Sequence, residues 1–185
     1  MIKFKPKIAG LQGQDNVSGI EQKVWLAEVG WFDVLQNTVR QLNDSLPDDR
    51  ESAELLRITA DHTFKAGKGF IELYTTMDTG QLALPPAPAR DQSGSMASIQ
   101  VFYPGNDLDA MGFLYVAQNF EWIVLVTAPN GKVFQLGRAG LTCSVRPSYN
   151  TNTLTGERAG MAVTIEAFMI RPIVYEGVIT PYPTV

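Results

Sequence analysis

Apolar side chains alternate with other residues in several short segments, and this spacing constrains the fold more than any other feature of the sequence. The alternation is most regular in residues 161–170, where one side carries Met161, Val163, Ile165, Ala167 and Met169. Successive side chains of a β-strand point to opposite faces, so this spacing predicts strands with one buried face. The segments predicted to be strands are 23–29, 55–60, 70–76, 96–103, 121–128, 132–136, 141–145 and 161–170. The sequence therefore predicts a mainly β protein of about eight strands.

Two glycine-containing turns predict which strands are neighbours. Asn130-Gly131 is the kind of pair that favours a tight hairpin, and it lies between segments 121–128 and 132–136. The glycines Gly67 and Gly69, which adopt positive φ at no steric cost, separate segments 55–60 and 70–76. We therefore expect a hairpin at each of these turns.

One helix is predicted, from about Leu108 to Asn119. Asn106 or Asp107 can cap its first turn, and the carboxylate of Asp109 lies near its positive end. Its apolar residues form a broad stripe that includes Leu108, Met111, Leu114, Tyr115 and Phe120. Such a stripe must be buried against a sheet or a neighbouring subunit, and core packing is favoured over a functional aromatic box.

Length and composition favour one domain that spans residues 1–185. The chain has 185 residues, 45% of them hydrophobic, which suffices for one core and is short for two. Segments 36–52 and 77–94 are longer than ordinary connections, and prolines 85, 86 and 88 place the second at an edge or projecting outward. The predicted fold class is a β-sandwich or open barrel of about eight strands with one α-helix and two long loops.

Charge, cysteine content and hydropathy argue against nucleic-acid binding, a dependence on disulfides and insertion into a membrane. The net charge is −4 and no basic run occurs, whereas a nucleic-acid grip needs clustered Lys and Arg. The single cysteine, Cys143, cannot form an internal disulfide, so the fold does not depend on an oxidising compartment. No stretch approaches the roughly 18 apolar residues that cross a bilayer, so we expect neither a secretion signal nor a membrane anchor.

The sequence offers few groups for catalysis, cofactors or metals. His62 is the only histidine, and its neighbour Asp61 would point to the opposite face of a strand, so a surface or turn histidine is favoured over a general base. Cys143 lies in an alternating strand, where a free thiol usually serves as a small buried hydrophobe. The carboxylates of segment 44–51 lack the spacing of a calcium loop. We expect no enzyme activity, no cofactor and no metal site.

The order of features from Lys23 onward resembles the major tail tube proteins of long-tailed bacteriophages. The resembling segments are KVWLAEVGWF, DHTFKAGKGFIELYTT, NDLDAMGFLYVAQNF, EWIVLVTAPNGKVFQLGRAG and TGERAGMAVTIEAFMIRPIVYEG. The resemblance implies a β-sandwich with a single helix, whose copies join through sheet edges into six-fold rings that stack into a hollow, DNA-conducting tube. It also implies other tail proteins as partners and a place in the virion tail, after synthesis in the host cytoplasm.

The two long loops are the predicted contacts between subunits. Contacts that do not close on themselves propagate into filaments, and long loops suit such stacking contacts, although each loop also fits a flexible surface segment. The residues predicted at the interface are Asp44, Pro47, Asp48, Asp49, Arg50, Leu82, Pro85, Pro86 and Arg90. A mildly acidic chain also suits a conduit, because a negative lumen repels phosphates and lets DNA pass without specific binding.

Two other functions are also consistent with the sequence. A β-sandwich binding module would use loop aromatics such as Trp31, Tyr103 or Tyr149 to stack on a carbohydrate or another ligand. Another virion component, such as a tail terminator, decoration or adaptor protein, would share the fold and differ in its contacts. An enzyme is the least favoured class, because His62 stands alone.

Overall fold

The computed structural model describes residues 18–38, 52–86, 94–151 and 159–183. Within these ranges the chain forms twelve strands, one α-helix and two short 3₁₀ helices. The strands are β1 (Lys23–Glu28), β2 (Phe32–Val34), β3 (Arg57–Ile58), β4 (Thr63–Phe64), β5 (Ile71–Tyr74), β6 (Gln81–Ala83), β7 (Ser95–Pro104), β8 (Trp122–Thr127), β9 (Val133–Leu136), β10 (Ser144–Asn150), β11 (Gly160–Met169) and β12 (Ile173–Tyr175). The helices are α1 (Leu108–Ala117), η1 (Val29–Trp31) and η2 (Ser52–Leu56).

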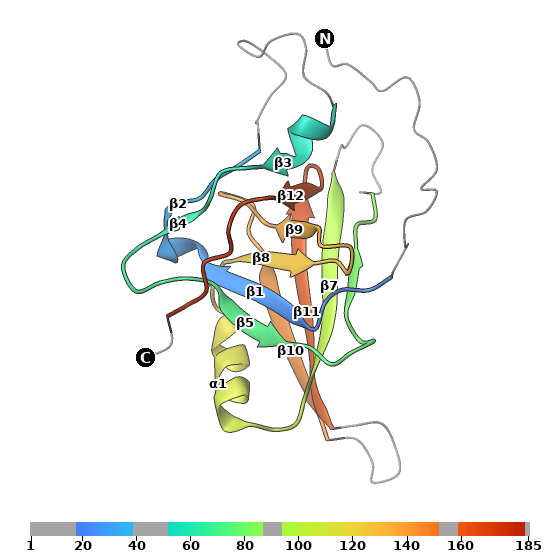
Figure 1. Ribbon diagram of the computed structural model, residues 1–185. Helices are drawn as coiled ribbons and strands as arrows, with labels where there is room; N and C mark the ends of the chain where they lie inside the picture. Colours follow the sequence, from blue (N-terminus) through green and yellow to red (C-terminus); the bar gives the residue numbers. More distant parts are fainter. Residues whose placement is uncertain (1–17, 39–51, 87–93, 152–158, 184–185) are drawn as a thin grey trace.

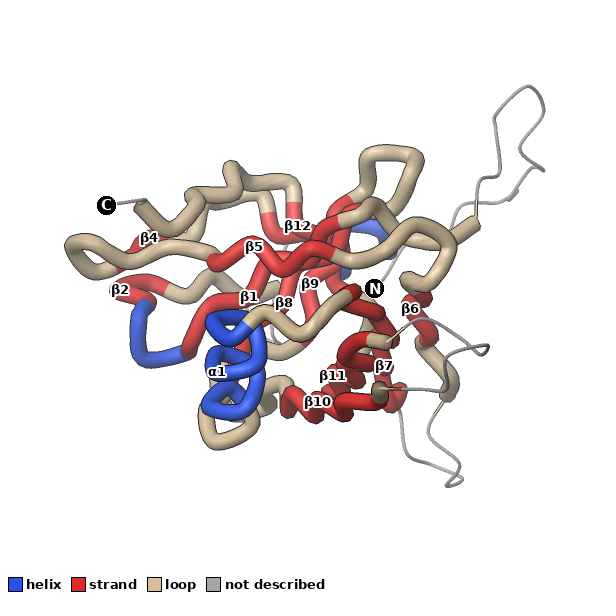
Figure 2. The backbone as a smooth tube through the Cα atoms, turned by 90° about the horizontal axis from the view of Figure 1, so that it is seen from below, coloured by secondary structure: helices blue, strands red, loops and turns tan. Residues whose placement is uncertain are grey.

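Two sheets pack as a β-sandwich, and they do not close into a barrel (Figure 1). The larger has the order β3-β12-β9-β8-β1-β5, antiparallel except for β3 beside β12, and the smaller has the order β10-β11-β7-β6. Figure 2 shows β5, β1, β8 and β9 in one layer and β10, β11 and β7 in the other. The mainly β class is confirmed. The expected eight strands are an undercount, since strands of two or three residues are too short to show alternation.

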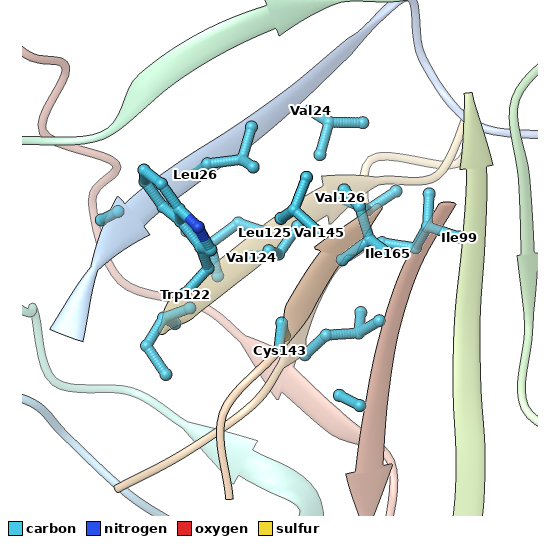
Figure 3. Packing of buried hydrophobic residues seen from close by; sticks show 14 of the residues in the cluster. Val24, Leu26, Ile99, Trp122, Val124, Leu125, Val126, Cys143, Val145 and Ile165 are labelled. Carbon is cyan, nitrogen blue, oxygen red and sulfur yellow. The ribbon is translucent and has the colours of Figure 1, made fainter. Parts of the chain in front are cut away.

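The core between the sheets is built from the predicted apolar faces. The five alternating residues of β11, from Met161 to Met169, are all buried, and β11 pairs with β7 along its whole length. Register places Val24, Leu26, Val124 and Val126 on one face of the larger sheet. Figure 3 shows them packed with Ile99, Val145 and Ile165 of the smaller sheet.

The second face of the larger sheet is also covered, by a cluster of aromatic rings. Phe32 of β2 lies 4.5 Å from Phe64 of β4 and 5.9 Å from Phe70, between ring centroids. The His62 ring joins this cluster and reaches Gln135, which is opposite Leu125 in the β8–β9 register. Strand β8 is therefore buried on both faces, which accounts for its continuous apolar run.

One of the two predicted hairpins is confirmed and the other is wrong. Strands β8 and β9 form the expected hairpin, and Gly131 between them has φ +78°. By contrast, residues 55–60 contain the end of η2 and β3, and β3 pairs in parallel with β12 rather than with β5. The turn at Gly67 connects β4 to β5 instead, and β5 pairs with β1, where Leu73 lies opposite Val24. Strands β3 and β5 therefore pair with strands that are distant in the sequence, and they do not form the expected hairpin with each other.

Helix α1 begins as predicted and ends two residues early. The carboxylate of Asp107 accepts a hydrogen bond from the Ala110 N–H at 3.3 Å, which caps the helix. Leu114 is fully buried, but Leu108 is 81% exposed and Tyr115 is 70% exposed. Only part of the predicted stripe therefore packs on the described sheets. No helix within the described ranges is both long and apolar enough to span a bilayer.

Truncating Leu125 to alanine should lower the free energy of unfolding by about 2–5 kcal/mol, because its side chain is fully buried in β8. The matched control, Leu108→Ala, should change it by less than about 0.5 kcal/mol, because Leu108 is largely exposed. Urea denaturation of dilute protein measures both. Equal losses for the two variants would contradict the packing of β8 described above.

Candidate functional site

Three of the nine predicted interface residues, Leu82, Pro85 and Pro86, lie within the described part of the chain. The other six, Asp44, Pro47, Asp48, Asp49, Arg50 and Arg90, lie outside the described residues.

The described part of segment 77–94 forms a sheet edge rather than a simple loop. Strand β6 pairs with β7, with Leu82 opposite Ile99, and it ends the four-stranded sheet. Leu82 is half-buried and packs on the core, so it anchors the edge. Pro85 and Pro86 are exposed and extend the pairing, since Met96 N–H donates to Pro85 O at 3.2 Å and Pro86 bridges Ser95. The edge position predicted from the prolines is confirmed for residues 77–86, and Pro88 lies outside the described residues.

The two sheets of the sandwich end in four edge strands, β3 and β5 on the larger and β10 and β6 on the smaller. The C-terminal segment covers the start of β5, because Phe70 N–H donates to Thr180 O and Tyr182 N–H donates to Phe70 O. Strand β10 is the longest of the four, with seven residues, and no described strand lies on its outer side. Pro147 lacks one of the outward N–H donors of this edge, and the remaining backbone groups can pair with another chain.

His62 is buried, contrary to the expectation of a surface histidine. It is 3% exposed, and its ring stacks on Tyr175 with 4.5 Å between centroids. Its Nδ1 accepts the Gln36 N–H at 3.1 Å, so its Nε2 carries the proton and donates to Gln135 Oε1 at 2.9 Å. Loss of hydration on burial lowers the pKa of His62. Both nitrogens of the neutral ring are engaged, which suits a structural role.

The hydrogen bonds around His62 fasten the segment that follows β12. Tyr175 Oη accepts the His62 N–H at 3.2 Å and donates to Val178 O at 3.0 Å. Asp61 Oδ1 accepts the Val178 N–H at 2.7 Å. Burial also raises the pKa of Tyr175. Sequence reasoning missed this network, and its one visible signal was Gln135, an amide within the otherwise apolar β9 sequence VFQL.

Cys143 has the predicted role of a small buried hydrophobe. It is 2% exposed, and its backbone pairs with that of Trp122. Burial raises the pKa of its thiol far above the ordinary value, so the reactive thiolate is not formed near neutral pH. No group of three His, Cys, Asp or Glu suited to a metal ion occurs among the residues described.

The aromatic residues proposed for a binding module do not form one platform. Trp31 packs edge-on against Trp122 at 6.1 Å, and Lys68 Nζ lies 5.0 Å from the centre of its ring. Tyr103 and Tyr149 lie on the other sheet, each opposite Met161 and separated by β11. A hollow of about 600 Å³ lies elsewhere, and its lining includes Glu21, Lys23, Glu72, Tyr74 and Asp78.

The chain matches no protein-family model, and neither a curated protein nor a solved structure matches it.

Stability should fall on acidification in a way that depends on His62. The folded pKa of His62 lies below its unfolded value of about 6.5, so its contribution is complete above that pH and is lost as pH falls toward the folded pKa. The stability advantage of the native chain over His62→Gln should therefore shrink between about pH 7.5 and about pH 5.5, measured by urea unfolding. A constant difference across this range would contradict a buried neutral histidine.

The Cys143 thiol should resist modification in the folded protein. A chromogenic disulfide reagent should label it at least about a hundredfold more slowly in buffer than in denaturant, because the native thiol is both inaccessible and protonated. A Met96→Cys variant, whose new thiol replaces a side chain that is 51% exposed, supplies the control for reagent access. Rapid labelling of the native chain would place Cys143 at the surface.

Proposed function

We propose that this protein is a structural subunit that self-assembles into stacked rings forming the hollow tube of a phage tail. The observation that carries the proposal is the outer edge of β10 over residues 144–149, beside which no described strand lies, at the end of a well-packed sandwich. Pairing that edge with a strand of the next copy would satisfy its backbone groups and extend the sheet from subunit to subunit. The segment resemblance and the single helix support the same function.

The surroundings of the reactive side chains and the net charge are consistent with a structural subunit. His62 and Cys143 are the histidine and the thiol available for catalysis, and both are buried in structural contacts. The net charge of −4 favours passage of DNA over retention, because a negative wall does not gain the counterion release that drives phosphate binding. The subunit would therefore guide DNA without reading its sequence.

Two further functions remain as alternatives. A tail terminator or adaptor would use the same ring contacts and stop at a single ring. A carbohydrate- or ligand-binding module is favoured by the hollow of about 600 Å³ near Tyr74, which has the size of a small-molecule site. The two alternatives differ in assembly, because a terminator or adaptor forms a ring and a binding module has no need to polymerise.

The purified full-length protein should form rings or tubes in negative-stain electron micrographs, and its light-scattering mass should rise with concentration. Tyr149→Pro should prevent ring formation and keep the fold. Pro147 already lies in β10, and Tyr149 shares its alternation, so the N–H that is removed faces away from β11.

Tyr149→Thr is the matched control, because it shortens the side chain and keeps the N–H. It should assemble like the native protein. A native chain that stays monomeric at all concentrations would overturn the proposed function, and assembly of Tyr149→Pro would remove β10 from the ring contact.

A further inference from the structure

Helix α1 presents an apolar face that no described part of the chain covers. Leu108 is 81% exposed and Tyr115 is 70% exposed, and their spacing of seven residues places them on the same side of the helix. Val116, in the same helix, and Phe120, just after it, are 48% and 43% exposed. Large apolar side chains gathered in this way usually mark an interaction site.

Gly112 lies between Leu108 and Tyr115 on this face. A glycine inside a helix costs about 1 kcal/mol relative to alanine. A Cβ built on Gly112 would meet no atom within 4 Å, so packing in the described fold does not require a glycine there. The missing side chain leaves room for a second surface to approach the helix backbone closely.

A hollow that could receive this face is bordered by β3, β12 and the turn between β8 and β9. Its volume is about 470 Å³, and it is lined by Leu56, Arg57, Gly131, Lys132, Val133, Val174, Tyr175, Glu176 and Gly177. Val178 follows directly and is 67% exposed, which extends the apolar rim. In Figure 1, β3 and β12, which border the hollow, lie at the upper end, and α1 lies at the lower end.

The charges of the two surfaces are complementary. Helix α1 contains Asp109, follows Asp107, and has no Lys or Arg between Leu108 and Ala117. In the hollow, Arg57 is paired with Glu176 at 3.3 Å, which leaves the positive charge of Lys132. A negative helix end and a positive rim attract each other and would also fix the orientation of docking.

We propose that the outer face of α1 docks in the Lys132 hollow of a second copy of this chain. The inference rests on the proposed function and names the contact that stacks one ring on the next. Because each subunit would carry the helix at one end and the hollow at the other, the contact is head-to-tail. Such a contact leaves a free helix and a free hollow after every addition, so it propagates along the tube axis.

Cysteine cross-linking tests the contact directly. Tyr115→Cys subunits and Lys132→Cys subunits are mixed and oxidised mildly, with the buried Cys143 present in both. A disulfide-linked dimer is expected in the mixture and not in either variant alone. A Tyr115→Cys dimer formed as readily without the second variant would show helix-to-helix packing and overturn the proposal.

Charge reversal tests the electrostatic part of the contact. Lys132→Glu should raise the critical concentration for tube formation at least about tenfold, because it sets two like charges against each other. Adding Asp109→Lys to the same chain should restore assembly to within about threefold of the native value. Met96→Ser, which removes an exposed apolar side chain from β7, should leave assembly unchanged.

The outcomes separate this inference from the proposed function. If the native chain forms no rings or tubes, the proposed function fails first. If the native chain forms tubes and Lys132→Glu forms them equally well, only the stacking contact fails. If Lys132→Glu forms single rings that do not stack, and the added Asp109→Lys restores stacking, the result supports both the proposed function and the stacking contact.

Discussion

The burial of β8 on both of its faces is the constraint on which the rest of the fold depends. One face of this strand closes the sandwich core against the smaller sheet, and the other lies under the aromatic cluster of Phe32, Phe64 and Phe70. A strand buried on both sides needs a neighbour at each edge, because its backbone groups have no access to water. Strands β1 and β9 supply those neighbours. The remaining strands of the larger sheet pair outward from β8, with β12 and β3 beyond β9 and β5 beyond β1.

The polar network around His62 is a consequence of the same arrangement. Gln135 lies in the register row of Leu125, so its amide is buried with the aromatic cluster and needs partners there. It donates to Gly137 O at 3.1 Å and accepts from His62, which in turn is fixed by Gln36 and Tyr175. A buried hydrogen-bond network rigidifies a core when every polar group in it has a partner. Removal of one group leaves the others without partners. The only histidine of the chain is thereby committed to holding three segments together.

Sequence patterns were sufficient where the structure is local or regularly alternating. The predicted face of β11, the Asp107 cap and the Asn130-Gly131 hairpin depend on neighbouring residues, and all are confirmed. The pairing of β3 with β12 joins residues more than a hundred positions apart, and no short-range signal encodes it. His62 was misplaced for a related reason, since its burial is set by Tyr175 and Gln135, which are distant in the chain.

Two features of the described residues support the proposed assembly. The outer edge of β10 offers backbone groups beside a finished sandwich, and the outer face of α1 offers apolar area beside a completed core. The two differ in direction, because the edge can extend a sheet sideways, while β3 and β12, which border the Lys132 hollow, lie at the upper end of Figure 1 and α1 lies at the lower end. One contact that closes into a ring and another that repeats along an axis are together what a tube requires. A globular binding module would need neither contact, whereas the proposed tube would use the exposed Leu108 and Tyr115.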